Sequence, residues 1–277
     1  MVHPDNKTHS ISIGYNLMVH PDIKLSHSSS TAFCSKQLWY KKVGGEPFNY
    51  NFYSGAGTLV DAGYEAGLKN IMTGIQGSNI RKSMEQKLGD MEKELGYEDF
   101  VKLTQSIDSH VRAVEDYMGW INYKPLETQH FFNVIFDDHT RRTTGYMDIL
   151  AERQNLPLII DVKRQSKPIK KAKREWVMQG ALYALVLMHK RNLTAIPAFE
   201  NHLIIPDQPP VFLKTDLTPE DLFMAYKLLT ELNSRIDNDY WPLNRSHALC
   251  SPMWCGVYDK CHYENFESVD ELLQRIQ

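Results

Sequence analysis

Apolar residues recur every three or four positions through most of residues 28–120, which is the spacing of one face of a helix. Three segments carry the pattern most clearly, at 57–70, 82–95 and 97–121. This part of the chain is therefore predicted to be mainly helical.

The middle of the chain changes to β-prone runs of branched and aromatic side chains, at 131–136, 143–151 and 158–162. Helical spacing returns over 172–190, and 201–206 has the pattern of a strand that ends at a proline. Helices and strands in this order predict an α/β fold, with helices packed against a sheet.

A strong helix start follows at Thr218, where an N-cap hydroxyl precedes Pro219, Glu220 and Asp221. The proline suits the first helical position, and the two acids lie near the positive end of the helix dipole. We expect this helix to reach about residue 236.

The composition fits a globular chain of 277 residues, of which 42% are hydrophobic and 23% charged. The longest apolar run has eight residues, at 181–188, well short of the roughly 20 that a membrane span needs. Residues 1–10 are polar and lack the apolar core of a signal peptide. We therefore expect a cytoplasmic protein, in a bacterial host cell if the chain is phage-encoded.

The net charge of −3, from 31 Lys and Arg against 34 Asp and Glu, argues against a general nucleic-acid coat protein. A local patch can still attract a polyanion, and residues 163–174 carry seven positive charges and no acid. This basic patch is either a solvated loop and helix start or a phosphate-binding surface. Its cations are Lys163, Arg164, Lys167, Lys170, Lys171, Lys173 and Arg174.

Two acidic residues in the β-prone region are candidate metal ligands. If their strands form a hairpin that turns at Gln154-Asn155, residues whose numbers sum to 309 face each other. Asp148 then faces Asp161, with Cβ atoms about 5 Å apart. Lys163 is two residues beyond Asp161 and projects from the same face.

Two carboxylates this close repel each other unless a cation lies between them, and their hard oxygens suit Mg²⁺ or Mn²⁺. A neighbouring lysine can orient an attacking water or help to deprotonate it. The alternative is a surface hairpin in which an Asp and a Lys merely pair. Against it, the strand before Asp161 is apolar, the basic patch follows, and Gln179 and Tyr183 share one face of the next helix.

These residues form three motifs in order, with Asp61 and Glu65 on an upstream helix: Gly145-x-x-Asp148, Asp161-Val162-Lys163 and Gln179-x-x-x-Tyr183. With these motifs the sequence resembles the PD-(D/E)XK nucleases, specifically their RecB-like branch. The resemblance implies a restriction-endonuclease-like core, a mixed central sheet flanked by helices. The sequence departs from that branch at Asp61, where the branch usually has a histidine.

The resemblance also implies how a divalent metal is held. Asp61, Asp148, Asp161 and the backbone carbonyl of Val162 are the implied ligands of Mg²⁺ or Mn²⁺. Lys163 is the implied group that activates water or stabilises charge.

Further roles follow from the same resemblance. Glu65 is implied to position the metal or the water, and Gln179 and Tyr183 to position the DNA strand or Lys163. Nucleic-acid contacts are expected from the basic patch, between Arg164 and Arg174.

Four cysteines form another candidate site, with Cys34 far from the C-terminal trio Cys250, Cys255 and Cys261. Disulfides suit a secreted protein and buried thiols are a second interpretation, but the clustered trio favours metal ligation. Four thiolates suit zinc or a [4Fe–4S] cluster. The one-plus-three layout resembles the iron–sulfur nucleases of the AddB and CRISPR-adaptation type, which implies a [4Fe–4S] cluster, with zinc as the alternative.

Aromatic residues are dense just before the helix predicted at 57–70, with basic residues among them. They either stack the bases of a single strand or belong to the core. They are Trp39, Tyr40, Phe48, Tyr50, Phe52 and Tyr53.

Together these features predict a flexible leader at 1–27 and one RecB-like nuclease domain at 28–277. Within the domain we expect a helical part at 28–125, a catalytic sheet and helix at 126–210, and a helix plus cysteine cluster at 211–277. The expected activity is metal-dependent hydrolysis of DNA, as an exonuclease on single strands or duplex ends, with a helicase or recombination partner. The alternatives are a non-catalytic DNA- or partner-binding module on the same fold, and a zinc-stabilised protein with other substrates.

Overall fold

A five-stranded mixed sheet forms the centre of the molecule. The computed structural model describes residues 23–26, 38–40, 44–45, 51–74, 79–241 and 261. The strand order follows the chain from β1 to β5, and neighbouring strands are antiparallel except for β3 and β4, which are parallel. The strands are β1 (Lys124–Val134), β2 (Thr143–Arg153), β3 (Leu156–Arg164), β4 (Ala198–Ile204) and β5 (Val211–Thr215).

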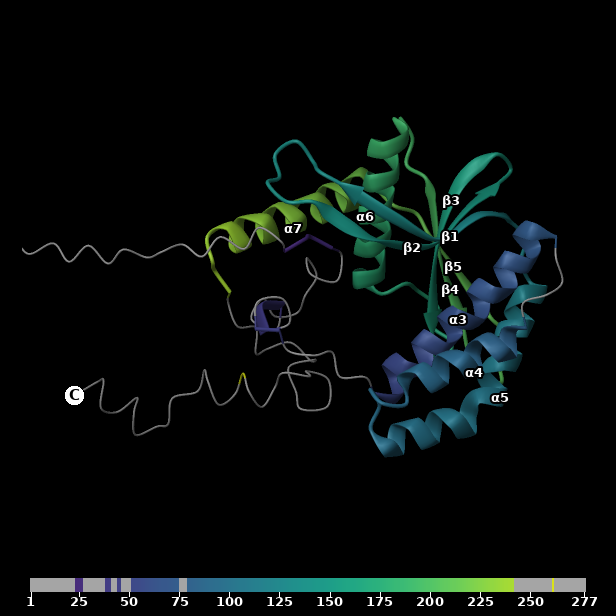
Figure 1. The fold of residues 1–277 in the computed structure, drawn as a ribbon. Helices are drawn as coiled ribbons and strands as arrows, with labels where there is room; N and C mark the ends of the chain where they lie inside the picture. Colours follow the sequence, from purple (N-terminus) through teal and green to yellow (C-terminus); the bar gives the residue numbers. More distant parts are fainter. Residues whose placement is uncertain are drawn as a thin grey trace, which may run out of the picture.

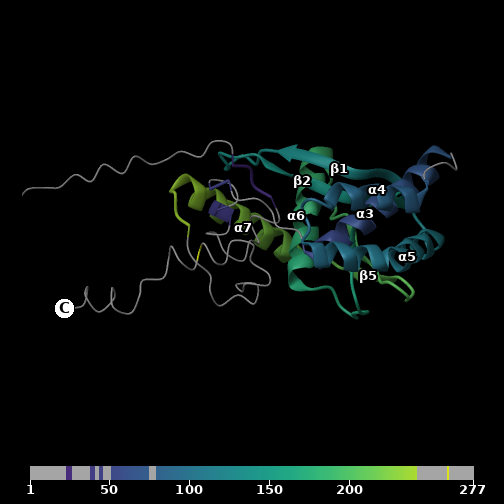
Figure 2. The same ribbon diagram turned by 60° about the horizontal axis from the view of Figure 1, so that its bottom comes forward.

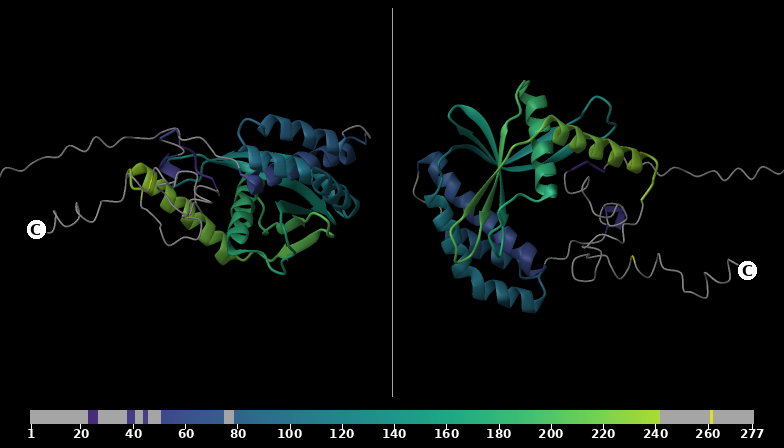
Figure 3. Two further views of the ribbon diagram at one scale, coloured as in Figure 1. Left: turned by 90° about the horizontal axis from the view of Figure 1, so that it is seen from below. Right: turned by 180° about the vertical axis from the view of Figure 1, so that it is seen from behind.

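Helices cover both faces of the sheet (Figures 1 and 3), and the predicted α/β fold with a mixed, helix-flanked sheet is confirmed. One buried apolar cluster joins the sheet to α3, α4 and α5, and a second joins it to α6 and α7. No helix in the described part of the chain is long and apolar enough to cross a bilayer. The helices are α3 (Phe52–Thr73), α4 (Ile80–Met91), α5 (Tyr97–Gly119), α6 (Arg174–Arg191) and α7 (Pro219–Asp237).

Side-chain caps fix where two of the predicted helices begin. The side chain of Asn51 accepts a hydrogen bond from the Ser54 N–H (3.0 Å), so α3 starts before the apolar spacing becomes regular. The helix start predicted at Thr218 is confirmed, because its hydroxyl accepts from the Asp221 N–H (3.2 Å) and the Asp221 carboxylate accepts from the Thr218 N–H (3.0 Å). Such caps satisfy backbone donors that a helix leaves unpaired.

The hairpin of β2 and β3 has the predicted register. Paired residues sum to 309, beginning with Ile149 opposite Ile160. The turn residues Gln154 and Asn155 have φ angles of 54° and 64°, which is the geometry of a tight two-residue hairpin turn. β3 is buried on both faces over most of its length, and this explains its continuous apolar run.

Two strands differ from the sequence prediction. β1 starts at Lys124, well before the apolar run at 131–136, because an edge strand with one solvated face tolerates polar side chains. β5 has five residues, of which only Leu213 is buried, so its signal in the sequence is weak. It joins the sheet from within the segment expected to hold a helix and a cysteine cluster.

Residues 23–26, inside the segment expected to be a leader, contact the sheet. Leu25 is buried. Its N–H donates to the carbonyl of Arg142 (2.9 Å), and its carbonyl accepts from the N–H of Thr144 (2.8 Å). This short segment therefore lies against the start of β2, before the pairing of β2 with β3 begins.

α6 packs closely against β4 at Gly180. A Cβ atom at this position would lie 2.3 Å from Cδ1 of Phe199, so any larger residue would push the helix away from the sheet. The close contact fixes the positions of Gln179 and Tyr183, which the same helix carries.

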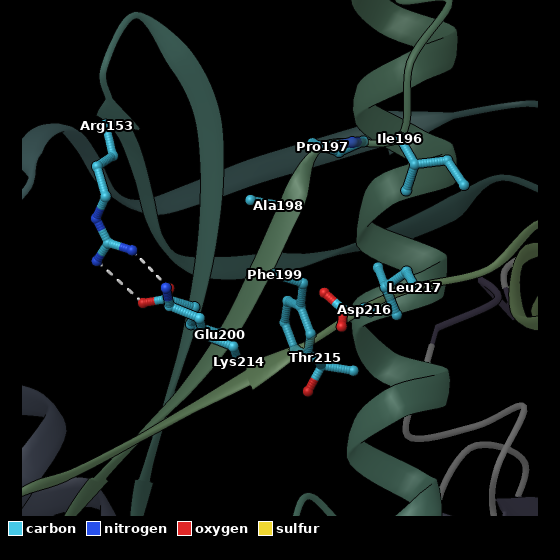
Figure 4. Close-up of a pocket in the computed structure, with 10 residues that line it drawn as sticks. All are labelled: Arg153, Ile196, Pro197, Ala198, Phe199, Glu200, Lys214, Thr215, Asp216 and Leu217. Atoms are coloured by element: carbon cyan, nitrogen blue, oxygen red, sulfur yellow. Dashed lines mark hydrogen bonds and ion pairs between the residues drawn. The ribbon is translucent and has the colours of Figure 1, made fainter.

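A buried polar network ties β4 to α5 and to the turn between β2 and β3. The Tyr117 hydroxyl lies 2.9 Å from the Tyr123 hydroxyl and 2.9 Å from His202 Nδ1. Since His202 Nε2 donates to the Glu200 carboxylate (3.0 Å), Nδ1 accepts and the Tyr117 hydroxyl donates to it. Arg153 closes the network with hydrogen bonds of 2.6 and 3.1 Å to Glu200 (Figure 4).

A cavity of about 300 Å³ opens beside this network at the start of β4. Lys163 pairs with Leu203 near the other end of that strand, so the cavity is separate from the acidic residues predicted to bind metal. Its lining, drawn in Figure 4, consists of Arg153, Ile196, Pro197, Ala198, Phe199, Glu200, Lys214, Thr215, Asp216 and Leu217.

Candidate active site

Four ionisable side chains gather where β2 and β3 separate, and we call them the carboxylate cluster. Asp61 comes from α3, Asp148 from β2, and Asp161 and Lys163 from β3. Lys163 Nζ donates to Asp161 Oδ1 at 2.7 Å. Burial shifts the pKa of Asp61 and of Asp148 most, and the charges of Lys163 and Asp161 also shift both. The structure thus brings together the three carboxylates and the lysine that the sequence singled out.

Asp148 lies where the pairing of β2 is interrupted on both sides. The register with β1 skips Gln129 opposite it, and the register with β3 begins only at Ile149. Gln129 has a φ of 49°. In a regular strand Met147 and Ile149 would point to the same face of the sheet, but Met147 packs with α6 and α7 and Ile149 packs with α3. β2 is therefore irregular at Asp148. The Asp148 carboxylate accepts a hydrogen bond from the Val162 N–H (2.8 Å), which holds it against β3.

Asp161 is fully buried, and both of its carboxylate oxygens are bonded. Oδ1 accepts from Lys163, and Oδ2 accepts from Asn201 Nδ2 at 2.8 Å. Asn201 pairs with Asp161 across the parallel contact of β3 and β4 and is itself fully buried. Its own Oδ1 has no hydrogen-bond partner among the described residues.

Sequence reasoning missed Asn201 because parallel pairing joins residues that are 40 positions apart and leaves no local pattern. The one available signal was the run of polar residues at 200–202 inside an otherwise apolar strand. Buried polar residues in a central strand need partners, and here those partners lie on both faces of the sheet.

Burial makes the charged forms of the carboxylates in the cluster costly. It raises the pKa of Asp61 from 3.8 to about 7, an effect that Lys163 reduces and that Glu65 and Asp161 increase. Burial and the charge of Asp161 also raise the pKa of Asp148 well above its usual value. Burial lowers the pKa of Lys163, but the charges of Asp161 and Asp148 outweigh it and raise that pKa overall. The lysine is therefore protonated at neutral pH, and one ammonium faces three carboxyl groups.

Glu65 lies on α3 at the rim of a cavity of about 340 Å³ between α3 and α4. Burial raises its pKa, while Lys69 and Lys87, which line the same cavity, and Gln129 lower it. Gln129 also donates to the hydroxyl of Tyr64 (2.9 Å). Tyr64 and Gln129 connect α3 to β1 beside the carboxylate cluster. The sequence analysis predicted neither of them as a site residue.

Gln179 and Tyr183 lie together on α6, on the opposite side of the sheet from α3. Gln179 Nε2 donates to the Tyr183 hydroxyl at 2.7 Å. The pKa of Tyr183 is raised, first by burial and then by the charges of Asp148 and Asp161. The hydroxyl is therefore close enough to both carboxylates to feel their charge.

Gly145, the first residue of the Gly-x-x-Asp motif, makes room for an aromatic ring. A Cβ atom there would lie 2.6 Å from Cζ of Phe132, its partner on β1. The Phe132 ring in turn packs edge-on against Tyr183, with 5.8 Å between ring centroids. The glycine thus allows the packing that supports Tyr183 beside the cluster.

The basic patch follows β3 and leads into α6. Lys167, Lys170 and Lys171 are exposed, and within the described part of the chain none of them belongs to an ion pair. Three other cations of the patch contact neighbouring side chains. The guanidinium of Arg164 lies 5.6 Å from the ring centre of Phe52, and Lys173 Nζ lies 5.1 Å from the ring centre of Trp176. Arg174 forms an ion pair with Asp221 (2.5 Å).

The chemistry of the carboxylate cluster fits Mg²⁺ or Mn²⁺. Its oxygens are hard ligands, and burial raises the pKa of Asp61 and of Asp148, so the charged carboxylates gain from a nearby cation. Among the described residues, no group of three or more His, Cys, Asp or Glu side chains is arranged so that it could hold a metal ion by itself. Mg²⁺ is usually bound by one or two carboxylates, with water and substrate phosphates as further ligands. Asp148 and Asp161 supply such a pair.

The predicted cysteine site lies mostly outside the described residues. Cys34, Cys250 and Cys255 fall outside them, and Cys261 is described as a partly buried residue. The [4Fe–4S] cluster and its zinc alternative therefore stay predictions.

The aromatic residues predicted either to stack bases or to form core have mixed positions. Tyr40 is fully buried, as a core residue, whereas Tyr53 is 54% exposed at the start of α3. Phe48 and Tyr50 lie outside the described residues.

Comparison with known proteins identifies a family. The model of the PD-(D/E)XK nuclease superfamily matches residues 48–265, a range that contains the whole carboxylate cluster. No curated protein matches the chain at a significant level.

A solved structure supports the fold. A protein of Eubacterium rectale described as a candidate exonuclease is similar over 95% of both chains, with 14% sequence identity and a TM-score of 0.51. At this identity the likeness concerns the fold alone. A second solved protein, SSO0001, has 13% identity, with 74% of this chain and 84% of that one covered, and its TM-score of 0.29 is too low to carry an argument.

Asp61 provides a test of the charge balance in the carboxylate cluster. Because its pKa is raised from 3.8 to about 7, the folded state binds this proton more tightly than the unfolded state. In metal-free protein, stability is therefore lost as the pH rises from about 4 to about 7. We expect Asp61→Asn to raise the unfolding free energy of EDTA-treated protein at pH 8 by up to about 4 kcal/mol, with little change at pH 4.

Urea unfolding at the two pH values measures this effect. Asp116→Asn is the matched control, because Asp116 is exposed on α5. The charge-balance argument is wrong if both variants respond to pH in the same way.

Proposed function

The chain belongs to the PD-(D/E)XK nuclease superfamily, and on that premise we propose that it is a Mg²⁺- or Mn²⁺-dependent deoxyribonuclease. The observation that carries the proposal is the carboxylate cluster, in which Asp148 and Asp161 lie beside a protonated lysine where the two inner strands β2 and β3 separate. Hydrolysis of a phosphodiester needs a cation near the phosphate and a positioned water. This set of side chains supports both requirements.

In the proposed reaction, Asp148, Asp161 and the carbonyl of Val162 would hold the cation, with Asp61 as an additional ligand. A bound divalent cation neutralises charge on the phosphate and makes water a better nucleophile. The aspartate at position 61, in place of the usual histidine, adds negative charge and so favours a hard cation over a softer one.

Lys163 acts in this scheme as a hydrogen-bond donor. Its pKa is raised by Asp161 and Asp148 despite burial, so at neutral pH it carries its proton and is a poor base. A protonated amine held 2.7 Å from Asp161 suits the stabilisation of charge on a phosphate oxygen or the orientation of the attacking water. Asn201 acts through Asp161 as a positioning residue, because it fixes the second carboxylate oxygen.

The substrate is proposed to be DNA, attacked as an exonuclease at single strands or duplex ends. Lys167, Lys170 and Lys171, which are exposed in the segment after β3, are proposed to bind the phosphates of the strand. Gln179 and Tyr183 are proposed to orient that strand or Lys163 from the α6 side. A helicase or recombination partner that supplies such ends belongs to the same proposal.

We further propose that Cys34, Cys250, Cys255 and Cys261 hold a [4Fe–4S] cluster. The support is the one-plus-three spacing of the cysteines in the sequence. Such a cluster would link the N-terminal part of the chain to its C-terminal part and stabilise the fold through ligation.

Cleavage of end-labelled single-stranded DNA tests the nuclease proposal. We expect the wild-type protein to release nucleotides with Mg²⁺ or Mn²⁺ and to lose this activity in EDTA. Asp161→Asn and Lys163→Gln are each expected to lower the rate by about 100-fold or more and to bind DNA nearly as the wild type does. Lys227→Gln, at an exposed position of α7, is the control for a lost positive charge.

Metal-dependent cleavage that survives in Asp161→Asn contradicts the proposal. Wild-type protein that binds DNA but does not cleave it under any of these conditions favours the non-catalytic alternative.

Iron content and visible absorbance of protein purified without oxygen test the cysteine site. We expect about four iron atoms per chain, a brown colour, and loss of both in Cys34→Ser and Cys261→Ser. A colourless folded protein with one zinc per chain would assign the thiols to zinc instead.

A further inference from the structure

An exposed aromatic pair lies on β1 and β2. Phe131 and Tyr146 face each other in the strand register, with ring centroids 5.1 Å apart and 48° between the ring planes. Phe131 is 49% exposed and Tyr146 is 54% exposed. Neighbouring large apolar groups at the surface of a globular protein often mark a binding site.

The described helices leave the face that carries these rings open. Phe132 and Met147, the adjacent residues on each strand, are buried on the opposite face among residues of α6 and α7. Figure 2 shows the β1–β2 hairpin reaching past α3, α4 and α5, with α7 on its other side. The residues beneath already anchor the hairpin, so the exposed rings are not needed to complete the core.

The pair is adjacent to the carboxylate cluster. Tyr146 precedes Asp148 by two residues, so their Cα atoms lie at most about 7 Å apart, a distance that one nucleotide of an extended single strand spans. α3 lies on the same side of the sheet and contributes Asp61 and Tyr64 beside Asp148. A base stacked on the pair would therefore place a neighbouring phosphate close to the cluster.

The other side chains on this face suit a nucleic-acid strand. Beyond the aromatic pair come Asn133 opposite Thr144, and then Arg142, which donates to Asn133 (3.4 Å). The strip from Tyr146 to Arg142 thus offers ring faces, an amide, a hydroxyl and a guanidinium, and it has no carboxylate. Aromatic surface combined with positive charge is the chemistry with which proteins bind single strands.

We propose that Phe131 and Tyr146 form a stacking surface for the unpaired bases of single-stranded DNA and guide the strand to the carboxylate cluster. The inference rests on the proposed nuclease function and narrows its substrate. Bases inside a duplex have no ring face available for the pair, so this surface selects single strands and frayed ends. Loss of one stacked base weakens binding by about 5- to 150-fold.

Fluorescence anisotropy of labelled oligo(dT) in EDTA measures binding without cleavage. The variant Phe131→Thr/Tyr146→Thr removes both rings and keeps β-branched residues that suit a strand. We expect it to bind oligo(dT) at least about fivefold more weakly. The slope of log affinity against log salt concentration should not change, because no phosphate contact is lost. Tyr146→Phe, which retains the ring, should bind as the wild type does.

Phe223→Ala is the matched control, because Phe223 is 63% exposed but lies on α7. Unchanged affinity in a folded double threonine variant overturns the proposal, and so does an equal loss for blunt duplex DNA. A second readout uses only wild-type protein: 2-aminopurine placed along the oligonucleotide should lose fluorescence on binding at one or two positions. Unchanged fluorescence at every position also overturns the proposal.

Cleavage with Mg²⁺ is scored separately, so that the two proposals fail independently. If wild-type protein cleaves oligo(dT) and the double threonine variant binds it normally, the stacking surface alone is rejected. If wild-type protein shows ring-dependent binding but no cleavage, the nuclease function alone is rejected.

Discussion

The partial or complete burial of three neighbouring carboxylates beside one lysine is the constraint on which the rest of this structure depends. Asp61, Asp148 and Asp161 come from three separate elements, and burial makes their charged forms costly. Lys163 offsets part of that charge, and a proton or a divalent cation offsets the remainder. The surrounding fold fixes the carboxylates, since Asp148 is bonded to the backbone of β3 and Asp161 is bonded on both oxygens.

β4 supplies much of this rigidity through side chains that alternate between the two faces of the sheet. Asn201 points to Asp161, whereas Glu200 and His202 bond to Arg153 and Tyr117 on the other side. Burial raises the pKa of Glu200, but the hydrogen bonds and charges of His202 and Arg153 outweigh it and bring that pKa to about 2. The strand that positions Asp161 is thus itself held by a charged, hydrogen-bonded network that is buried at its centre.

Much of the fold could be predicted from the sequence because the patterns that indicate its helices and turns are local. Helical spacing, the cap at Thr218 and the turn at Gln154-Asn155 each depend on a few neighbouring residues, and the turn fixes the register that brings Asp148 to β3. β5 was missed because only one of its side chains is buried.

The site was predicted where its residues are close in sequence and missed where they meet only in space. Asn201 reaches Asp161 through parallel pairing, and Gln129 reaches Tyr64 from a break in β1 that no local pattern signals.

The central claim is that Asp148 and Asp161 share one divalent cation. Crystals soaked in Mn²⁺ and measured at the manganese absorption edge test it most directly. We predict one anomalous peak within bonding distance of both carboxylates, and its absence from wild-type protein, or a peak that touches neither residue, would contradict the account.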